Sequence, residues 1–486
     1  MKSMKNVFRL LTCIVLLNAC TPHPEHVADT TIPAPIYPDY TDITLPPNIA
    51  PLNFLLRNDA DAVQVTVKSR TDSLTVNSRG NRVCFPEKHW KSFLRNVKGE
   101  TLQVTVLSRT DGQWLRHPSF RWSVAKEPID SYLSYRLIEP GYEVWNKVEL
   151  HERNLTNFKE KVIATHRNTD NACMNCHIYG NKSGELSMFH LRGAKGGTIL
   201  NRDGKLRKLT LKNNEMVSGA VYGDFHPSGR FGVFSTNLII PAFHSQGSQR
   251  LEVYDTASDL VIADFDTNRL IISPLVSRKD VLETFPTFSP DGKTVYYCSA
   301  DTVSLPQDIR SLKYSLCCIG FDAETQTWGE RIDTLWDARQ TNASVCHPKV
   351  SPDGRYLLYT VADYGTFPIW HRETELQMMN LQTGCIDSLS AVRAEGSESY
   401  HSWSSNSRWF VFAGKRGDGQ YGKPYFCYVA PDGKVHKPFV LPQKYPEHYD
   451  LTLKSYNLPD LSATPLPFNA EMIGSIYKNR EAETFR

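Results

Sequence analysis

The chain has 486 residues, of which 40% are hydrophobic, and a formal net charge of +3 at pH 7. This length is sufficient for two or three domains with ordinary hydrophobic cores, and the charge is too small to indicate nucleic acid or another strongly charged partner. The 29 Pro and 28 Gly residues, spread among short apolar runs, favour a β-rich fold with many turns.

The N-terminus has the pattern of a secretory signal. Three basic residues precede the apolar run 10–17, which is too short to span a bilayer. The run ends in Leu-Asn-Ala followed by Cys20, and this resembles the bacterial lipoprotein signal, in which the Cys after the cleavage site is acylated. Asn18 departs from the small or apolar residue that is usual at its place.

We therefore expect a lipoprotein signal peptide at residues 1–19 and lipidation at Cys20. The lipid would attach the protein to a membrane of the bacterial envelope. We expect the outer membrane, facing the periplasm, with which Thr21 after the lipid-bearing Cys is compatible. The alternative is an ordinary cleaved signal with Cys20 as a spare thiol.

Two segments follow the expected signal. Residues 20–47 are rich in Pro, Thr, Asp and His and indicate a flexible tether. Residues 48–126 contain alternating runs, such as 62–67 and 101–106, separated by turn residues. Alternation with a period of two is typical of half-buried antiparallel strands, so we predict a small β-sandwich domain there.

Residues 127–196 are predicted to form a partly helical connector that carries the run Cys173-Met-Asn-Cys176-His177. Covalent haem attachment requires two thiols and an imidazole at this spacing, because each Cys sulfur bonds one vinyl group and the His ligates the iron. Haem c is attached outside the cytoplasm, where a secreted chain would receive it, whereas in a cytosolic protein the same run more often indicates zinc or a redox dithiol.

If haem c is present, its sixth ligand should be Met or His. Met188 and His190 are the nearest candidates along the chain, and the metal ligands would then include His177 and His190. A Met ligand would raise the potential of the iron, and a pair of His ligands would lower it. In the alternative interpretation, Met188 is a packing residue and His190 is a strand residue with satisfied hydrogen bonds.

The remaining residues, 197–486, contain a repeat. Four turns each precede an apolar, aromatic run, and they are spaced by about 62 residues twice and then by about 53: His226-Pro-Ser-Gly229, Ser289-Pro-Asp-Gly292, Ser351-Pro-Asp-Gly354 and Ser404-Ser-Asn-Ser407. This spacing suits one four-stranded blade of a β-propeller with variable loops. The turns resemble the TolB-like, or PD40, β-propeller repeats of bacterial envelope proteins, which serve as scaffolds, sensors and peptidase gates alike.

The predicted fold is therefore mainly β, with a propeller of about six blades, five or seven being alternatives, preceded by the small β-sandwich. Radial stacking of blades buries both faces of each sheet, and closure of the ring leaves only short edges. Five side chains near the starts of the innermost strands are candidates for a polar or metal-binding site at the mouth of the central channel: His226, Glu283, His347, Glu398 and His401. Each one, taken alone, is also compatible with a solvated or hydrogen-bonded turn residue.

Two functions remain open from the sequence. The first is an envelope lipoprotein with covalently bound haem c that transfers electrons or senses redox state, with an envelope protein as partner. The second is a non-enzymatic propeller binding module in which Cys173 and Cys176 form a disulfide or a metal clip. We expect no enzyme activity, because residues after Tyr428 lack the Gly-x-Ser-x-Gly elbow of the propeller-bearing peptidases and no other catalytic motif is found.

Overall fold

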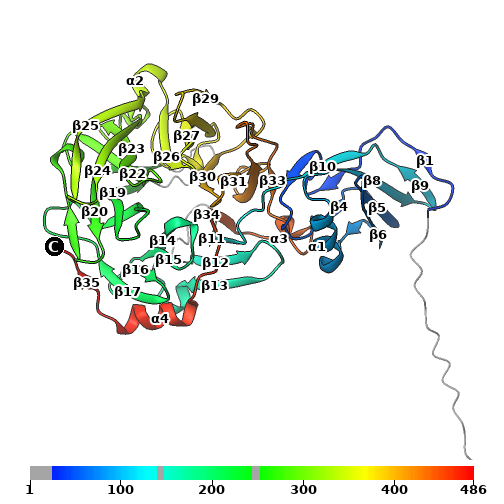
Figure 1. Ribbon diagram of the computed structural model, residues 1–486, viewed down its shortest axis with the longest axis horizontal. Helices are drawn as coiled ribbons and strands as arrows, with labels where there is room; N and C mark the ends of the chain where they lie inside the picture. The colour runs from blue at the N-terminus through cyan, green and yellow to red at the C-terminus, as the bar shows by residue number, and fades with distance from the viewer. Residues whose placement is uncertain (1–23, 140–146, 243–251) are drawn as a thin grey trace, which may run out of the picture.

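The computed structural model of the protein describes residues 24–139, 147–242 and 252–486. Figure 1 shows its two parts, a smaller N-terminal domain and a ring of sheets that forms a β-propeller. The predicted fold class, a mainly β chain with a propeller, is confirmed. Within the described residues, no helix is both long and apolar enough to cross a membrane.

The N-terminal domain is built on a seven-stranded sheet. Its strands are β1 (Ala28–Asp29), β9 (Gln113–Arg116), β8 (Thr101–Thr110), β10 (Phe120–Val124) and β3 (Ile43–Leu45), with β5 (Ala62–Lys68) and β6 (Ser73–Arg79) attached through β8. The two alternating runs of the sequence form β5 and β8, which pair antiparallel. Val63, Val65 and Val67 of β5 are buried, as the alternation predicts.

A second, three-stranded sheet and a helix complete this domain. The sheet consists of β2 (Ile36–Tyr37), β4 (Phe54–Leu56) and β7 (Arg82–Val83), and the helix is α1 (Glu87–Asn96). Trp90, Phe93 and Leu94 lie at helical spacing on α1, and they are buried in the same hydrophobic cluster as the valines of β5.

The expected flexible tether, residues 20–47, is ordered structure from residue 24 onward. Strand β1 pairs in parallel with β9, and β3 pairs in parallel with β10. All three residues of β3 are buried. Strands of two or three residues are too short to show periodicity, and their partners lie about 80 residues away, so composition alone could not reveal them. Cys20 lies outside the described residues, and its lipidation stays a prediction.

The propeller has six blades among the described residues. From the innermost strand outward, the first blade consists of β34 (Ser455–Ser462), β11 (Tyr132–Ile138), β12 (Glu149–Asn154) and β13 (Glu160–Thr165), and the second of β14 (Met174–Tyr179), β15 (Leu186–Leu191), β16 (Gly197–Arg202) and β17 (Lys205–Thr210). The third blade consists of β18 (Ala220–Phe225), β19 (Phe231–Ala242), β20 (Glu252–Asp264) and β21 (Arg269–Ile271), and the fourth of β22 (Val281–Phe288), β23 (Thr294–Asp301), β24 (Ser315–Asp322) and β25 (Thr327–Trp336). The fifth blade consists of β26 (Ser344–Val350), β27 (Tyr356–Ala362), β28 (Glu375–Asn380) and β29 (Ile386–Asp387), and the last of β30 (Glu398–Trp403), β31 (Trp409–Gly414), β32 (Lys423–Tyr428) and β33 (Phe439–Val440).

The ring closes through the pairing of distant segments. Strand β34, near the C-terminus, pairs antiparallel with β11 and becomes the innermost strand of a blade whose other strands precede residue 166. The region expected to be a connector, residues 127–196, therefore contributes strands β11 to β13 of one blade and β14 and β15 of the next. The expected boundary at residue 197 is too late, because these strands lack the turn that marks the other repeats.

The repeated turns join the first and second strands of their blades. In the turn between β22 and β23, the hydroxyl of Ser289 donates to Asp291 Oδ1 at 2.5 Å, and the amide of Gly292 donates to the carbonyl of Ser289 at 2.9 Å. Gly292 has φ of 74°, a left-handed conformation that favours glycine. The repeated Ser-Pro-Asp-Gly sequence thus forms a tight turn that is stabilised by its own hydrogen bonds and reverses the chain direction.

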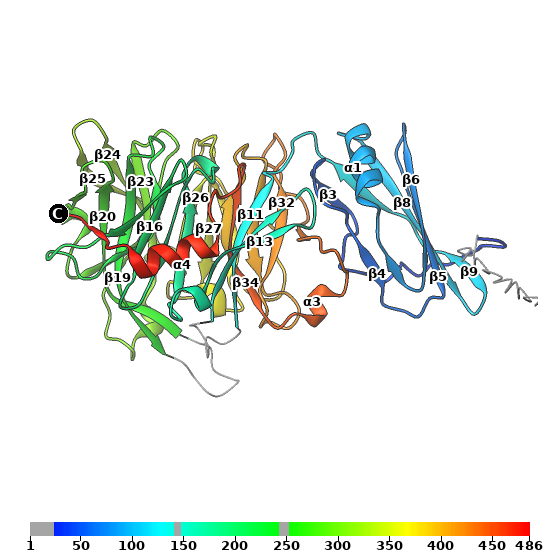
Figure 2. The ribbon, with the colours of Figure 1, turned by 90° about the horizontal axis from the view of Figure 1, so that it is seen from below.

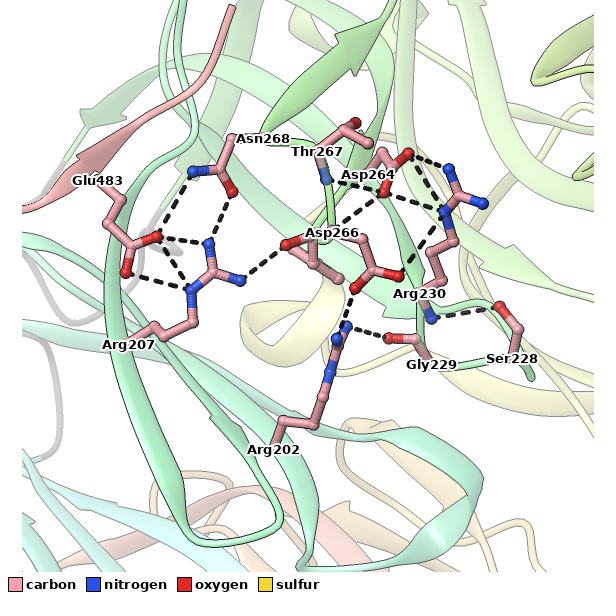
Figure 3. Close-up of polar contacts among 11 residues, drawn as sticks. Arg202, Arg207, Ser228, Gly229, Arg230, Asp264, Asp266, Thr267, Asn268 and Glu483 are labelled. Atoms are coloured by element: carbon pink, nitrogen blue, oxygen red, sulfur yellow. Dashed lines mark hydrogen bonds and ion pairs between the residues drawn. The ribbon is translucent and has the colours of Figure 1, made fainter.

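The C-terminal segment fastens the outside of the ring. Helix α4 (Ala470–Asn479) lies on the outer surface of the propeller (Figure 2), and β35 (Glu483–Thr484) adds a fifth strand beside β17. Figure 3 shows the contacts of β35, in which the guanidinium of Arg207 binds the Glu483 carboxylate at 2.5 Å and Asn268 at 2.7 Å. The other two helices are single turns, α2 (Ala338–Thr341) and α3 (His448–Leu451).

One hydrophobic cluster joins the N-terminal domain to the propeller. It contains Trp90 and Trp122 of the domain together with Trp409 and Phe426 of the last blade. Next to it, the carboxylate of Asp130 accepts hydrogen bonds from the Ser405 amide at 2.8 Å and hydroxyl at 2.6 Å. The domain is therefore docked on the blade that adjoins the ring closure.

Candidate functional site: the central channel of the propeller

The six innermost strands share an irregularity partway along their length. In each strand the pairing register shifts, which defines a β-bulge that re-aims one side chain. In five strands the residue at the bulge has φ between 50° and 52°: Cys176, Phe285, His347, Tyr400 and Leu458. A left-handed conformation costs a non-glycine residue roughly 1–2 kcal/mol, and such strain concentrates at functional sites.

These bulge residues line a cavity of about 680 Å³ at the centre of the ring. Tyr222 takes the corresponding place in β18 and also lines the cavity. The cavity is large enough for a ligand of cofactor size, and its lining combines apolar and aromatic side chains with a few charged ones. We call it the central channel.

The predicted haem-attachment residues lie in the wall of this channel. Cys173, Cys176 and His177 all line it, and together with Arg136 and Lys182 we call them the cysteine wall. Cys173 immediately precedes β14 and Cys176 lies at the bulge of that strand. Burial raises the pKa of the Cys176 thiol to about 11, so it is protonated at neutral pH. The run that we expected in a connector is thus part of an innermost strand.

His177 is buried, and its ring makes no hydrogen bond of ordinary geometry with the residues that the structure describes. Its side chain belongs to a residue that is 8% exposed, and neither ring nitrogen has a hydrogen-bond partner in the described part of the chain. Burial lowers the pKa of His177 to about 4, although the Asp460 carboxylate and the nearby backbone of Ser134 and Leu458 act in the opposite direction. The imidazole is therefore neutral at physiological pH, as a metal ligand must be. Unsatisfied buried polar atoms are rare in folded proteins and call for an explanation.

Arg136 holds the cysteine wall to the ring closure. Its Nη1 donates to the Met174 carbonyl at 3.1 Å and to Asn175 Oδ1 at 2.8 Å, and its Nη2 donates to Asn457 Oδ1 at 2.5 Å. One guanidinium on β11 therefore connects β14 with β34. This contact fixes the strand that carries Cys176 and His177.

The channel carries an excess of positive charge. Four cations and two anions line it: Arg136, Lys182, Arg192, Lys349, Asp224 and Asp460. Lys182 Nζ donates to Asp460 Oδ1 at 3.0 Å and to the Ser402 hydroxyl at 2.9 Å, and the Thr287 hydroxyl donates to Asp224. The anions are therefore engaged, and the net charge favours a ligand with carboxylate groups.

The opposite side of the channel is an arc of aromatic rings, which we call the aromatic wall: Tyr222, Phe285, His347 and Tyr400. Their ring centroids are separated by 4.7 Å, 4.0 Å and 4.8 Å in that order, across the strands β18, β22, β26 and β30. Such contacts stabilise tilted ring pairs. Neither ring nitrogen of His347 finds a hydrogen-bond partner among the residues that the structure describes, and burial lowers its pKa well below the usual value.

The two candidate sixth ligands lie elsewhere. Met188 is 1% exposed and belongs to a hydrophobic cluster between the second and third blades, with Leu200 and Phe234. The His190 nitrogens lie 2.7 Å from the Thr198 hydroxyl and 2.6 Å from the Val221 carbonyl. Both residues are absent from the channel lining in the described chain. Strand β15 pairs with β14, so His190 lies opposite Asn175, but the side chains of Met188 and His190 are engaged inside the blade and not in the channel.

The five predicted channel-mouth residues separate into two groups. His347 and His401 line the channel, and His401 Nε2 lies 2.8 Å from the Leu358 carbonyl. His226 packs its ring against Phe288 at 5.1 Å, outside the lining described. These residues therefore do not converge into one site.

The two glutamates of that prediction are buried two residues before a bulge. Glu283 lies 3.6 Å from Arg278, and Glu398 forms an ion pair with Arg416. Burial raises the pKa of Glu283 to about 8 and that of Glu398 to about 7, although the two arginines act in the opposite direction. Both belong to the blade interior and are not among the residues that line the channel in the described chain.

Sequence reasoning missed the aromatic wall except for His347. The signal was present, because each bulge residue lies four positions before the first residue of the repeated turn: Tyr222 before His226, Phe285 before Ser289, His347 before Ser351 and Tyr400 before Ser404. Cys176 and Leu458 occupy the corresponding places in the blades that lack the turn motif. Arg136 and Lys182 gave no such signal, since their partners are distant in sequence.

No protein-family model matches the chain, and no match was found among curated proteins. Among solved structures, TolB from Acinetobacter baumannii is similar with a TM-score of 0.44 and 11% identity, over 76% of this chain and 80% of that chain. An oligogalacturonate lyase from Vibrio parahaemolyticus gives a TM-score of 0.37 and 10% identity, over 78% and 86%. Prolyl oligopeptidase B from Galerina marginata gives 0.35 and 10%, over 81% and 54%.

Proposed function

We propose that the protein is a non-enzymatic haem-c-binding propeller of the bacterial envelope, which transfers electrons or senses redox state. The observation that carries this proposal is the position of Cys173, Cys176 and His177 in the wall of one central cavity, with both nitrogens of His177 unpartnered among the described residues. The sequence spacing supplies the attachment chemistry, and the cavity supplies the space.

Each residue of the cysteine wall has a role in this proposal. The thiols of Cys173 and Cys176 would hold the haem covalently by addition to its two vinyl groups, in which each sulfur bonds one carbon and its hydrogen passes to the other, so no oxidant is required. His177 would bind the iron through a ring nitrogen that is already neutral. Bound haem supplies one-electron redox chemistry.

The charged and aromatic residues elsewhere in the channel are also suited to haem. Lys182, Lys349, Arg136 and Arg192 provide positive charge for the two propionates. The aromatic wall would provide apolar contacts for the haem ring system and limit the access of water, which tunes the redox potential. The partner would be an envelope protein that exchanges electrons with the edge of the haem, and lipidation of Cys20 would keep this exchange at the membrane.

The test is maturation of the full chain in cells that contain the cytochrome c assembly machinery. We expect a haem-stained band after denaturing electrophoresis, and loss of this band in the double variant Cys173→Ser, Cys176→Ser. Cys385→Ser is the matched control, because Cys385 is exposed and remote from the channel lining described. A colourless wild-type protein would overturn the proposal.

The second candidate function is a ligand-binding channel in which Cys173 and Cys176 form a disulfide or a metal clip. It is favoured by the two thiols lying in one wall, close enough that Cys173 disfavours ionisation of Cys176. In that case the colourless product would contain either no free thiol at these positions or stoichiometric zinc that is lost in the Cys173→Ser variant.

A further inference from the structure

We propose that His347 is the second histidine that would bind the haem iron, together with His177. This inference rests on the proposed function. It replaces Met188 and His190, which were chosen by proximity in sequence, with a residue from a distant blade.

The order of the blades places the two histidines on opposite strands. The innermost strands follow one another around the ring as β14, β18, β22, β26, β30 and β34. Strand β26 is the third from β14 in either direction, so it lies across the channel from β14. His347 and Cys176 occupy the same bulge position in these two strands.

The position of its strand selects His347 among the histidines. His177, His347 and His401 line the channel in the described chain. His401 lies on β30, only two strands from β14 through β34, whereas His347 lies on the opposite strand β26. His401 Nε2 lies 2.8 Å from the Leu358 carbonyl and its Nδ1 has no partner, while both nitrogens of His347 lack a partner within that same set of residues. Loss of hydrogen bonds to water without replacement costs free energy, and a bond to iron would compensate this cost.

Packing also prepares the His347 ring for this role. The ring centroids of Phe285 and Tyr400 lie 4.0 Å and 4.8 Å from the imidazole centroid, so the ring is packed against two aromatic neighbours. The left-handed backbone at the bulge, with φ of 52°, directs this side chain to the channel. His347 shares this unfavourable backbone conformation with the other bulge residues, and it is the one histidine among them.

Two imidazole ligands predict a low-spin iron with a lower potential than a His and Met pair would give. The experiment uses the matured full chain and records the optical and electron paramagnetic resonance spectra of the ferric form. We expect a low-spin wild type and a high-spin His347→Asn variant that returns to low spin when free imidazole is added. Asn is chosen because it tolerates the left-handed backbone and is too short to reach the iron.

Two further variants sharpen the test. His347→Met should stay six-coordinate, show the long-wavelength band of Met-ligated ferric haem and have a raised midpoint potential. Met188→Leu is the matched control and should leave the spectrum and potential of the wild type unchanged. A low-spin spectrum in His347→Asn, with haem still attached on the gel, would overturn the assignment of the ligand alone. Absence of covalent haem from the wild type would overturn the proposed function and this inference together.

Discussion

The two walls of the central channel are built by different means. The aromatic wall consists of neighbouring rings from four consecutive blades, each placed by the same bulge before a repeated turn. The cysteine wall is assembled where the ring closes, by β14, β11 and β34, and a buried guanidinium joins its parts. The repeated architecture therefore supplies a shaped, apolar surface, and the closure supplies the reactive groups.

The largest expected effect comes from cutting the link between β14 and β34. Arg136→Met keeps an apolar stem but leaves the acceptors at Met174, Asn175 and Asn457 without their donor. Because unmaking buried hydrogen bonds to a charged group costs about 1.5–3 kcal/mol each, we expect the free energy of unfolding to fall by about 4 kcal/mol. Urea denaturation measures this loss.

The control for this prediction is Arg192→Met, which changes another cation of the channel lining that is exposed. We expect it to change stability by no more than about 0.5 kcal/mol. Equal losses of stability in the two variants would contradict the view that the hydrogen bonds of Arg136 stabilise the cysteine wall.

The next effect concerns the aromatic wall. Phe285→Ala removes a ring that is in contact with Tyr222, His347 and Phe367. We expect destabilisation of about 3 kcal/mol, at the lower end of the range for buried Phe, because one side of the ring already faces the cavity. Thermal or urea unfolding checks this value, and haem staining should persist in the variant, since the attachment residues lie in the other wall. Loss of staining with an intact fold would show that the walls act together in attachment.

The smallest expected effect concerns how the free energy of unfolding depends on pH. Burial raises the pKa of Glu283 to about 8, whereas an unfolded Glu has its ordinary pKa near 4.5. The folded state therefore binds more protons in this interval, and the stability that Glu283 contributes is present below pH 4.5 and is lost as the pH rises to about 8. Glu283→Gln removes this dependence. Between these pH limits, the free energy of unfolding of the variant should rise relative to that of the wild type by at most about 1.4 kcal/mol per pH unit.

Urea denaturation of both proteins at pH 5, 6, 7 and 8 measures this difference. Because the Arg278 guanidinium is about half exposed, its influence on Glu283 is screened and the slope should survive moderate salt. Parallel stability curves of the two proteins would show that Glu283 is ionised in the folded state.

The sequence by itself determined the propeller architecture and the residues of the Cys-x-x-Cys-His run. Turns such as Ser289-Pro-Asp-Gly292 carry local hydrogen bonds and a left-handed glycine, so their conformation depends on adjacent residues only. For the same reason the alternating valines of β5 predicted a half-buried strand. The spacing of Cys173, Cys176 and His177 is likewise a property of the chain alone.

The tertiary structure decided where these local features meet. Pairing of β34 with β11 spans more than 300 residues, so no local sequence pattern could predict the blade that closes the ring. Strands β1 and β3 are too short to be distinguished from a flexible tether by sequence. His190 is near the cysteines in sequence yet bound inside its blade, whereas His347 is distant in sequence and lies across the channel from Cys176. A ring of sheets converts equal positions in separate repeats into neighbours around one axis, and only closure of the ring fixes which of them face each other.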